Sequence, residues 1–435
     1  MRSRAISTLL FLSFLALAGC GSAARASLAP PLVFPTTATG PSGPPPLSVY
    51  VSANSQKSAA ITALNAQTGG RRWQYQSKVA TGYPYLDSGV VYFGAADGKV
   101  YALDAGSGSV KWNHSIGGFP AIITISNGVI YTGVSSFNAS GRNTQPGAVY
   151  ALNASDGSLT WQSKNTGFVA GIDKDAIYLT TTDNQVVAVN ISDGSLKWYY
   201  RADNMPYIAG TDNGQVYVIT SPNQGQQHSA FYALNASDGS VQWRFPSGSA
   251  NTAMGTIISV DSDTVYLEAN TATGLQVYNA NAIFALNIRD GSTRWQTTLQ
   301  GNGLLNIILD SGTVYTSATG GHVFALNTRD GSVLWATNAG NGYPNIEEID
   351  NGLLYVSSTG DGLYALNTQD GSKRWRYQSD EFVAVYGIVN GMVYAAAIPP
   401  QDPNEHSAVL GLNPADGTKL WSYDAGIGSI TLNIG

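Results

Sequence analysis

The sequence has little of what catalytic or covalent chemistry usually requires. It contains one cysteine, Cys20, in 435 residues, so no disulfide can form within the chain. The four histidines show no metal-ligand spacing, and there is no Ser-His-Asp set, phosphate-binding loop or dinucleotide fingerprint. Charged residues make up only 11% of the chain, and the net charge of −6 argues against the broad basic face that nucleic acids require.

The composition instead favours a rigid β-protein that is rich in turns. Hydrophobic residues reach 43% and there are 49 glycines. Helical periodicity is missing from the repeated part of the chain, where short alternating segments are separated by turn residues. We therefore expect an all-β fold, and the length allows one large domain or two ordinary ones.

The first nineteen residues have the features of an export signal. Arg2 and Arg4 precede an almost wholly apolar stretch at 9–18. The sequence Leu-Ala-Gly-Cys at 17–20 resembles a bacterial lipobox, which implies cleavage before Cys20 and attachment of a lipid to its sulfur. An ordinary signal with a chance cysteine is the alternative. The resemblance predicts an exported lipoprotein, anchored to a membrane and facing the periplasm or the outer surface.

The segment that follows the signal differs in composition from the rest of the chain. Residues 20–47 are rich in Pro, Ala, Ser, Thr and Gly, so they cannot bury a core. We interpret them as the lipidated cysteine and a spacer. The folded domain is then predicted to span residues 48–435.

An eleven-residue string recurs nine times in this domain. Two of the copies read ALNASDGSLTW at 151–161 and ALNASDGSVQW at 233–243. Every tryptophan of the chain ends one copy, at spacings of 37 to 52 residues: Trp73, Trp112, Trp161, Trp198, Trp243, Trp295, Trp335, Trp375 and Trp421. A period of this length indicates a repeat architecture.

The residues between two tryptophans predict four short strands. In the stretch 303–335, an apolar run ends at a Ser-Gly turn, an alternating run ends at Gly-Gly, and two further strands flank the string. Four antiparallel strands per repeat are typical of a propeller blade. We name the strands A to D from the propeller axis outward.

Each fixed position of the string has a structural explanation. The third residue is always Asn or Asp, which can accept backbone N–H groups in an Asx-type turn. The seventh is always Gly, which adopts a positive φ without steric cost. The final Trp is predicted on outer strand D, across the seam between neighbouring blades. Its burial would contribute at most about 4–6 kcal/mol per copy.

The string closely resembles the tryptophan-docking motif of the quinoprotein, or PQQ-type, β-propellers. The resemblance covers residues 48–435, with Asp in place of Thr or Ser before Gly in seven copies. It implies an all-β propeller of four-stranded blades. Nine strings predict nine blades, and eight blades with one irregular unit are the alternative. We expect the N-terminal and C-terminal strands to pair and close the ring, because this removes an exposed sheet edge.

Two branches of the family imply different functions. PQQ-dependent dehydrogenases would require the quinone, Ca²⁺ and a catalytic Asp, but seven of the 28 acidic residues are turn residues on the periphery and cannot converge. Non-catalytic lipoproteins, such as the propeller lipoprotein of the outer-membrane β-barrel assembly machine, resemble this chain in lipobox, spacer and bare propeller. Resemblance to these lipoproteins predicts a scaffold without a cofactor, and a PQQ-dependent dehydrogenase is the alternative.

A partner is expected on the face that carries the B–C and D–A loops, because the B–C loops vary whereas the C–D turns are nearly identical. Long B–C loops are predicted at 135–148, 221–229, 269–281 and 398–407. The candidate binding residues are the aromatic residues of the D–A segments and polar residues of two loops: Tyr83, Phe119, Phe168, Tyr207, Tyr343, Phe382, Arg142, Asp402, Glu405 and His406.

Each group of these candidate binding residues also has a purely structural explanation. The aromatic rings can equally pack the narrow inner end of each blade, and the group of Asp402, Glu405 and His406 can be a solvated loop rather than a metal site. An aromatic rim could also bind glycans or cell wall. We predict a monomeric, lipid-anchored propeller that binds envelope proteins, has no catalytic or metal site, and does not bind nucleic acid.

Overall fold

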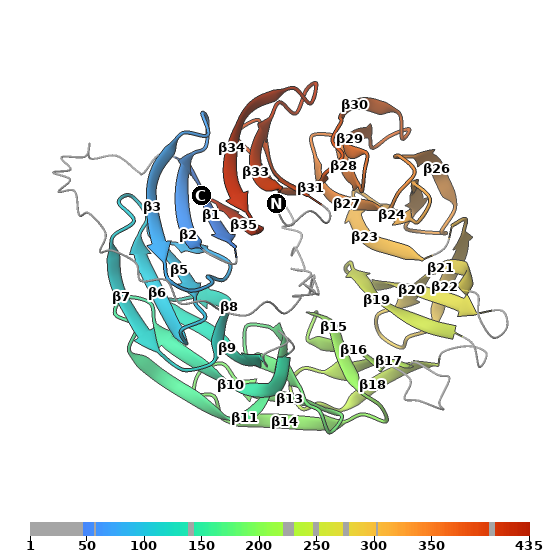
Figure 1. Ribbon diagram of the computed structural model, residues 1–435. Coiled ribbons are helices and arrows are strands. Elements are labelled where there is room, and N and C mark those ends of the chain that lie inside the picture. Colours follow the sequence, from blue (N-terminus) through green and yellow to red (C-terminus); the bar gives the residue numbers. More distant parts are fainter. Residues whose placement is uncertain are drawn as a thin grey trace, which may run out of the picture.

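The computed structural model describes residues 47–435, with gaps at 56–57, 138–142, 221–229, 247–251, 273–277, 302 and 400–404. All regular structure in the described residues is β-strand, and the strands are arranged in a ring (Figure 1). No helix in this part of the chain is long and apolar enough to cross a membrane. The prediction of an all-β propeller is confirmed.

The strands that the structure describes form seven four-stranded sheets and one seven-stranded sheet, all antiparallel. In the larger sheet, β11 (Leu159–Ile172) runs without interruption from one unit into the next, because its first part pairs with β10 and its second part with β12. Divided at β11, the described sheets make nine four-stranded units, which we number in chain order. Each contains one tryptophan string.

The bounds of the strands in units 1 to 4 are as follows, from the innermost strand outward. Unit 1 consists of β35 (Ser429–Ile434), β1 (Ser48–Asn54), β2 (Ala59–Asn65) and β3 (Arg71–Ser77), and unit 2 of β4 (Tyr85–Asp87), β5 (Val90–Gly94), β6 (Lys99–Asp104) and β7 (Val110–Ser115). Unit 3 consists of β8 (Phe119–Ser126), β9 (Val129–Phe137), β10 (Asn143–Asn153) and the start of β11, and unit 4 of the rest of β11, β12 (Ala176–Thr180), β13 (Gln185–Asn190) and β14 (Leu196–Arg201).

Units 5 to 9 follow the same order. Their strands are β15 (Pro206–Asp212), β16 (Gln215–Thr220), β17 (Ala230–Asn235) and β18 (Val241–Pro246) in unit 5, and β19 (Thr252–Val260), β20 (Thr264–Ala272), β21 (Tyr278–Asn287) and β22 (Thr293–Leu299) in unit 6. Unit 7 has β23 (Leu304–Asp310), β24 (Thr313–Ala318), β25 (His322–Asn327) and β26 (Val333–Asn338), unit 8 has β27 (Pro344–Asp350), β28 (Leu353–Ser358), β29 (Gly362–Asn367) and β30 (Lys373–Tyr377), and unit 9 has β31 (Phe382–Val389), β32 (Met392–Ile398), β33 (His406–Leu412) and β34 (Lys419–Ile427).

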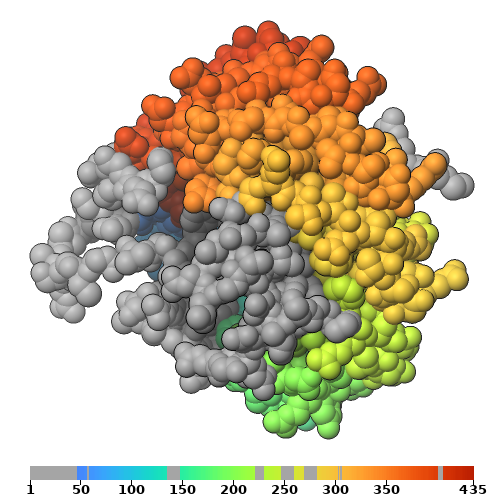
Figure 2. All heavy atoms as spheres, turned by 90° about the vertical axis from the view of Figure 1, so that its right-hand side faces the viewer, coloured from blue at the N-terminus to red at the C-terminus, as the bar shows by residue number. Residues whose placement is uncertain are grey.

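The last strand of the chain lies in the first unit. β35 pairs with β1 in an antiparallel register that includes Ser52 opposite Thr431, and the backbones of Ser48 and Gly435 exchange two hydrogen bonds of 2.8 and 3.0 Å. Consecutive units are neighbours along the rim, as the ordered colours from green to red show in the side view (Figure 2).

The connections emerge on two distinct faces. The C–D turn of unit 2 meets its A–B turn where the Ala105 N–H donates to the Gly89 carbonyl over 3.0 Å. The D–A connection meets the B–C loop where the Ile116 N–H donates to the Gly98 carbonyl over 2.9 Å. The predicted division into an A–B/C–D face and a B–C/D–A face is therefore observed.

The core is distributed between the units rather than concentrated at one centre. Among the residues whose burial the structure describes, the buried apolar ones form nine clusters. Each cluster draws on two neighbouring units and includes or touches one of the string tryptophans. In one such cluster, Trp198 of unit 4 packs with Val218 and Tyr232 of unit 5. This arrangement fixes each unit to its neighbour by apolar burial.

Two of the predicted B–C loops are shorter than expected. β9 and β10 extend into the predicted loop 135–148 and pair as far as Phe137 opposite Asn143. β20 and β21 likewise occupy much of the predicted loop 269–281, with Ala272 opposite Tyr278. The loops are shorter because the strands stay paired through the polar and glycine residues from which we predicted a loop. The segment 221–229 and residues 400–404 of the fourth loop lie outside the described residues.

Candidate functional site

The A–B/C–D end of every seam between units is closed by the same contact. Each string tryptophan donates its indole N–H to a backbone carbonyl in the C–D turn of the next unit, over 2.7 to 3.2 Å. The series is cyclic, because Trp421 of unit 9 donates to Ala66 of unit 1 over 3.1 Å. In all nine units the tryptophan therefore lies across the seam and bonds to the next unit.

The invariant glycine of the string has a second role that the sequence did not reveal. Each of the nine glycines has φ between 67° and 74°, as expected for the turn. Each also lies against the indole of the preceding unit: a Cβ on Gly157 would come within 2.5 Å of Cε3 of Trp112, and the other eight are equally close. Glycine is therefore required both by the turn and by the docked ring.

A tyrosine on strand B completes this contact, and we did not predict it. In every unit a tyrosine ring lies 5.7 to 6.3 Å from the string tryptophan, between ring centroids. The recurring signal was an apolar residue followed by Tyr near the start of each B strand: Tyr50, Tyr92, Tyr131, Tyr178, Tyr217, Tyr266, Tyr315, Tyr355 and Tyr394. In units 1, 2 and 7 the tyrosine hydroxyl donates to the carbonyl that the tryptophan also uses.

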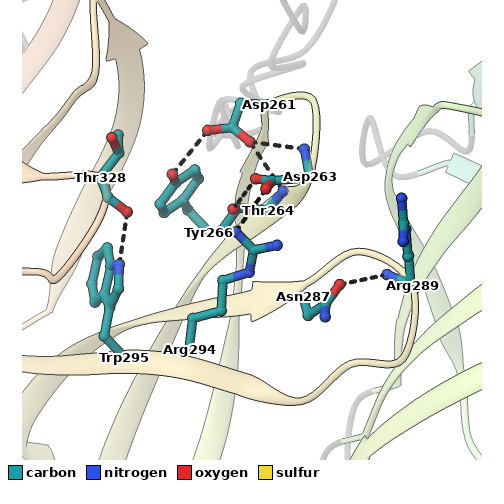
Figure 3. Close-up of polar contacts among 9 residues, drawn as sticks. All are labelled: Asp261, Asp263, Thr264, Tyr266, Asn287, Arg289, Arg294, Trp295 and Thr328. Carbon is teal, nitrogen blue, oxygen red and sulfur yellow. Dashed lines mark hydrogen bonds and ion pairs between the residues drawn. The ribbon is translucent and has the colours of Figure 1, made fainter.

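Figure 3 shows these contacts in unit 6, where the Trp295 indole N–H donates to the Thr328 carbonyl of unit 7 over 2.8 Å. Asn287 accepts the backbone N–H of Arg289 over 3.1 Å, which is the predicted Asx turn. Eight of the nine strings have such a turn, and in the ninth the Asn190 amide donates to Ser195 instead.

The seven string aspartates are turn residues. Each accepts the backbone N–H of the residue two positions later, and the hydroxyl hydrogen bond from Ser158 is the main reason that the pKa of Asp156 is below its usual value. One such aspartate stands on the periphery of each unit from 3 to 9, so they do not converge. In the part of the chain that the structure describes, no group of three or more His, Cys, Asp or Glu side chains could hold a metal ion.

The predicted aromatic residues of the D–A segments differ in exposure. Tyr207 is 47% exposed and Tyr343 is 62% exposed, so both present their rings on the B–C/D–A face. Phe119, Phe168 and Phe382 are only half-buried. The structure therefore presents two exposed rings, in units 5 and 8, rather than a ring of equally exposed aromatic residues.

Tyr83 has a different environment from the exposed aromatic residues. It is half-buried, its ring lies 4.9 Å from that of Tyr85 between centroids, and its hydroxyl accepts the amide of Asn433 over 3.2 Å. These contacts hold Tyr83 against the inner strand of unit 1.

Of the predicted polar residues of the loops, the structure describes Glu405 and His406. The Nδ1 of His406 lies 2.8 Å from Asp424 on the outer strand β34, and both side chains are largely exposed. Glu405 is exposed. Cys20, Arg142 and Asp402 lie outside the described residues.

Polar side chains gather on one sector of the inner wall. Glu347 on β27 accepts the Asn345 amide over 2.9 Å, the Ser357 hydroxyl, and a backbone N–H of Val385 in unit 9. Burial raises the pKa of Glu347 to about 7, although these hydrogen bonds oppose the shift. The wall therefore contains a carboxyl group that changes its charge near neutral pH.

The neighbouring units extend this polar sector. Burial, with contributions from Tyr83 and Glu347, raises the pKa of Tyr386 on β31 to about 12, and the Tyr386 hydroxyl donates to the Ile430 carbonyl of β35 over 3.4 Å. Glu347 and Tyr386 occupy the bulged position of their inner strands, and the same position is Ala170 in unit 4 and Ala209 in unit 5. At this position the wall thus carries polar groups in units 8 and 9 and small apolar residues in units 4 and 5.

The wall does not fit the cofactor of the quinoprotein dehydrogenases. PQQ is a tricarboxylic acid, and its binding would call for cationic partners. The described inner strands contain no Lys, Arg or His, and their polar sector contains the carboxylates Glu347 and Glu348. An anionic quinone would therefore meet like charge at this wall.

A family model described as outer membrane protein assembly factor BamB (PQQ_2) matches the chain repeatedly, at residues 35–164, 121–213, 145–306, 206–349 and 319–433. The chain belongs to this family. The predicted membership of the PQQ-type propellers is thereby confirmed. A search of curated proteins finds no match.

Two solved structures with TM-scores above 0.5 share the fold at low sequence identity. A eukaryotic initiation factor has a TM-score of 0.60 at 9% identity, covering 88% of this chain and 98% of its own. The designed Ika8 protein has a TM-score of 0.51 at 12% identity, covering 74% of this chain and 94% of its own. BamB from Moraxella catarrhalis has a TM-score of 0.45 at 18% identity, covering 71% of this chain and 88% of its own.

Proposed function

We propose that the protein is a non-catalytic, lipid-anchored scaffold of the bacterial cell envelope that binds envelope proteins through its B–C/D–A face and uses no cofactor. Membership of a family described as outer membrane protein assembly factor supports a protein-binding role in the envelope. The lipobox-like segment ending at Cys20, and the spacer that separates it from β1, support a membrane anchor.

The observation that carries this proposal is the difference between the two faces of the ring. On the A–B/C–D face, nine nearly identical turns and the docked tryptophans hold the units together. On the B–C/D–A face, the connections differ in length and sequence, and Tyr207 and Tyr343 expose large parts of their rings. Varied loops on a rigid support are where binding residues usually lie, and exposed tyrosines are common anchors at interfaces.

The proposal is tested by photo-crosslinking in intact cells from paired positions on the full-length protein. A benzophenone amino acid is placed at Tyr207 or Tyr343 on the B–C/D–A face, and at Val333, which follows a C–D turn on the other side. Val333 is a matched control because it is 47% exposed, as is Tyr207. We expect defined crosslinks to exported proteins from the two tyrosine positions and none from Val333.

Two outcomes contradict the proposal. The assignment of the binding face is wrong if neither tyrosine position gives crosslinks, or if Val333 gives crosslinks of equal strength. Reduction of an artificial electron acceptor by the purified protein with PQQ, Ca²⁺ and an alcohol or sugar overturns its non-catalytic part. The substitution Cys20→Ser should release the protein from membranes without changing its fold, since Cys20 precedes β1, the first strand of the propeller, in the sequence.

A further inference from the structure

The seam between units 9 and 1 closes the ring through contacts between the two ends of the chain. The last strand, β35, and the first, β1, lie side by side in unit 1 and are held together only non-covalently (Figure 1). Trp421 of unit 9 docks on the C–D turn of unit 1, where its indole N–H donates to the Ala66 carbonyl over 3.1 Å. Opening of the ring at this place would break both the strand pairing and the docking.

The docking tryptophan of unit 9 shares its N–H with a second acceptor. The thioether sulfur of Met392 lies 3.2 Å from Nε1 of Trp421, so the N–H is divided between this sulfur and the Ala66 carbonyl. For the other eight string tryptophans, the described residues provide a backbone carbonyl alone. A thioether is a weak acceptor, so the bond to Ala66 is the stronger of the two.

Two departures from the repeat create this arrangement. The first residue of the B strand is Ser, Val, Ala, Gln, Thr or Leu in the other units and methionine only at Met392. The residue opposite the tryptophan is a fully buried alanine in eight units and Gly411 in unit 9. A Cβ on Gly411 would come within 2.4 Å of the Trp421 indole and 2.9 Å of the Met392 sulfur. The glycine therefore makes room for both side chains.

The Met392 side chain belongs to the closing seam but is partly open to solvent. It is half-buried and follows Asn390 and Gly391, the exposed residues of the A–B turn of unit 9. It packs against the apolar cluster between units 9 and 1, which includes Leu64 and Ile430. Small oxidants can therefore reach a thioether that takes part in closing the ring.

We propose that Met392 is a site of reversible oxidation by peroxides and that its sulfoxide weakens the closure of the ring. In this step a lone pair of the sulfur attacks one oxygen of hydrogen peroxide, the O–O bond breaks, and the other oxygen leaves as water. The sulfur is oxidised by two electrons to the sulfoxide and the peroxide is reduced. Methionine sulfoxide reductases reverse this oxidation.

The sulfoxide changes both contacts of Met392. Its oxygen is a far stronger acceptor than the thioether sulfur, so it competes with the Ala66 carbonyl for the Trp421 N–H. A hydrogen bond between two units is then replaced by one within unit 9. The same polar oxygen lies against the apolar cluster of the seam, where its burial is unfavourable. Both effects loosen unit 1 from unit 9.

The test treats the purified full-length protein with dilute hydrogen peroxide and follows it by peptide mass spectrometry and amide hydrogen exchange. We expect one oxygen to be added at Met205, which is 52% exposed, and more slowly at Met392. As Met392 is oxidised, amide exchange in residues 429–435 should become at least about fivefold faster, because β35 separates from β1 more often. Exchange in β10 of unit 3 should not change, and methionine sulfoxide reductase should restore the original rates.

Matched variants separate Met392 from the other methionines. Met392→Leu keeps an apolar side chain of similar size, so exchange in 429–435 should stay within about twofold of its untreated rate when peroxide is added. Met205→Leu should respond to peroxide as the wild type does. Met392→Gln places a polar acceptor beside Trp421, so it should speed exchange in 429–435 before any peroxide is added. Met205→Gln should not.

Three results would overturn the proposal. If Met392 stays unmodified when Met205 is fully oxidised, its sulfur is closed to peroxide. If exchange in 429–435 is unchanged when Met392 is fully oxidised, the closure does not depend on the thioether. If the faster exchange persists in Met392→Leu, another residue is responsible. The test is independent of the proposed partner binding, because Met392 lies beside an A–B turn on the opposite face.

Discussion

The two ends of the seams between units differ sharply. At the A–B/C–D end, all nine seams have the same tryptophan, the same glycine beneath it and the same carbonyl acceptor. Towards the axis and the B–C/D–A face, the seams differ: rings fill the seam of units 1 and 2, the Glu347 carboxyl bridges units 8 and 9, and a groove remains between units 9 and 1. Repetition thus marks what holds the ring together, and departures from it mark where binding can occur.

The largest effect is expected at the repeated end. Trp161 is 9% exposed and donates to the Ile191 carbonyl across the seam of units 3 and 4. Trp161→Ala removes the buried ring and leaves that acceptor without its partner, so the free energy of unfolding should fall by about 3–5 kcal/mol. Urea denaturation followed by circular dichroism measures the loss. Leu159→Ala, on the same strand but 48% exposed, is the control and should change stability by less than about 1 kcal/mol.

An intermediate effect is expected at the variable part of the seam of units 8 and 9. Because burial raises the pKa of Glu347 from 4.5 to about 7, the folded protein holds this proton more tightly than the unfolded chain. The stabilisation is full below pH 4.5 and is lost as the pH rises to about 7. We expect this carboxyl to lower the free energy of unfolding by about 1–3 kcal/mol across that window.

The variant Glu347→Gln isolates this contribution, because its side chain stays neutral at every pH. Denaturant titrations at pH 5 and pH 7.5 should show a fall in stability for the wild type that is absent from the variant. Asp156→Asn is a control of opposite sign, since hydrogen bonds lower the pKa of Asp156 and its contribution is lost as the pH falls. An identical pH dependence of wild type and Glu347→Gln would show that the carboxyl is not secluded between the units.

The smallest effect compares a filled seam with the open one. Tyr75→Ala removes a ring that contacts both Phe93 and Tyr101, whereas Tyr423→Ala removes a ring that borders the groove between units 9 and 1. We expect Tyr75→Ala to lower the free energy of unfolding by about 1 kcal/mol more than Tyr423→Ala does, because an aromatic pair contributes that much. Parallel urea titrations of the two variants measure this difference. Equal losses would mean that Tyr423 is as well packed as Tyr75 and would contradict the contrast between the two seams.

The fold could be predicted from the sequence because its determinants lie within a short string. The positions of Asn153, Gly157 and Trp161 define a turn and a docking residue without reference to the rest of the chain. The tyrosines of the B strands were equally regular but were missed, because a Tyr after an apolar residue is ordinary in any strand. The contact of each glycine with the preceding unit's indole could not be predicted, since it depends on how two units pack.

The candidate sites were less predictable because they depend on neighbours across the ring. Glu347 and Tyr386 are neighbours in the inner wall only because the inner strands of consecutive units lie next to each other. The groove between units 9 and 1 appears only when β35 places unit 1 beside Tyr423 of unit 9. The loops 135–148 and 269–281 were overestimated because strand pairing continued through residues that favour turns.

The most direct test of this account is the ratio of crosslinking yields in intact cells from Tyr343 on the B–C/D–A face and Val333 beside a C–D turn. The account predicts strong, defined crosslinks to exported proteins from Tyr343 and none above background from Val333. A ratio near one, or crosslinks from Val333 alone, would contradict the division between a structural face and a binding face.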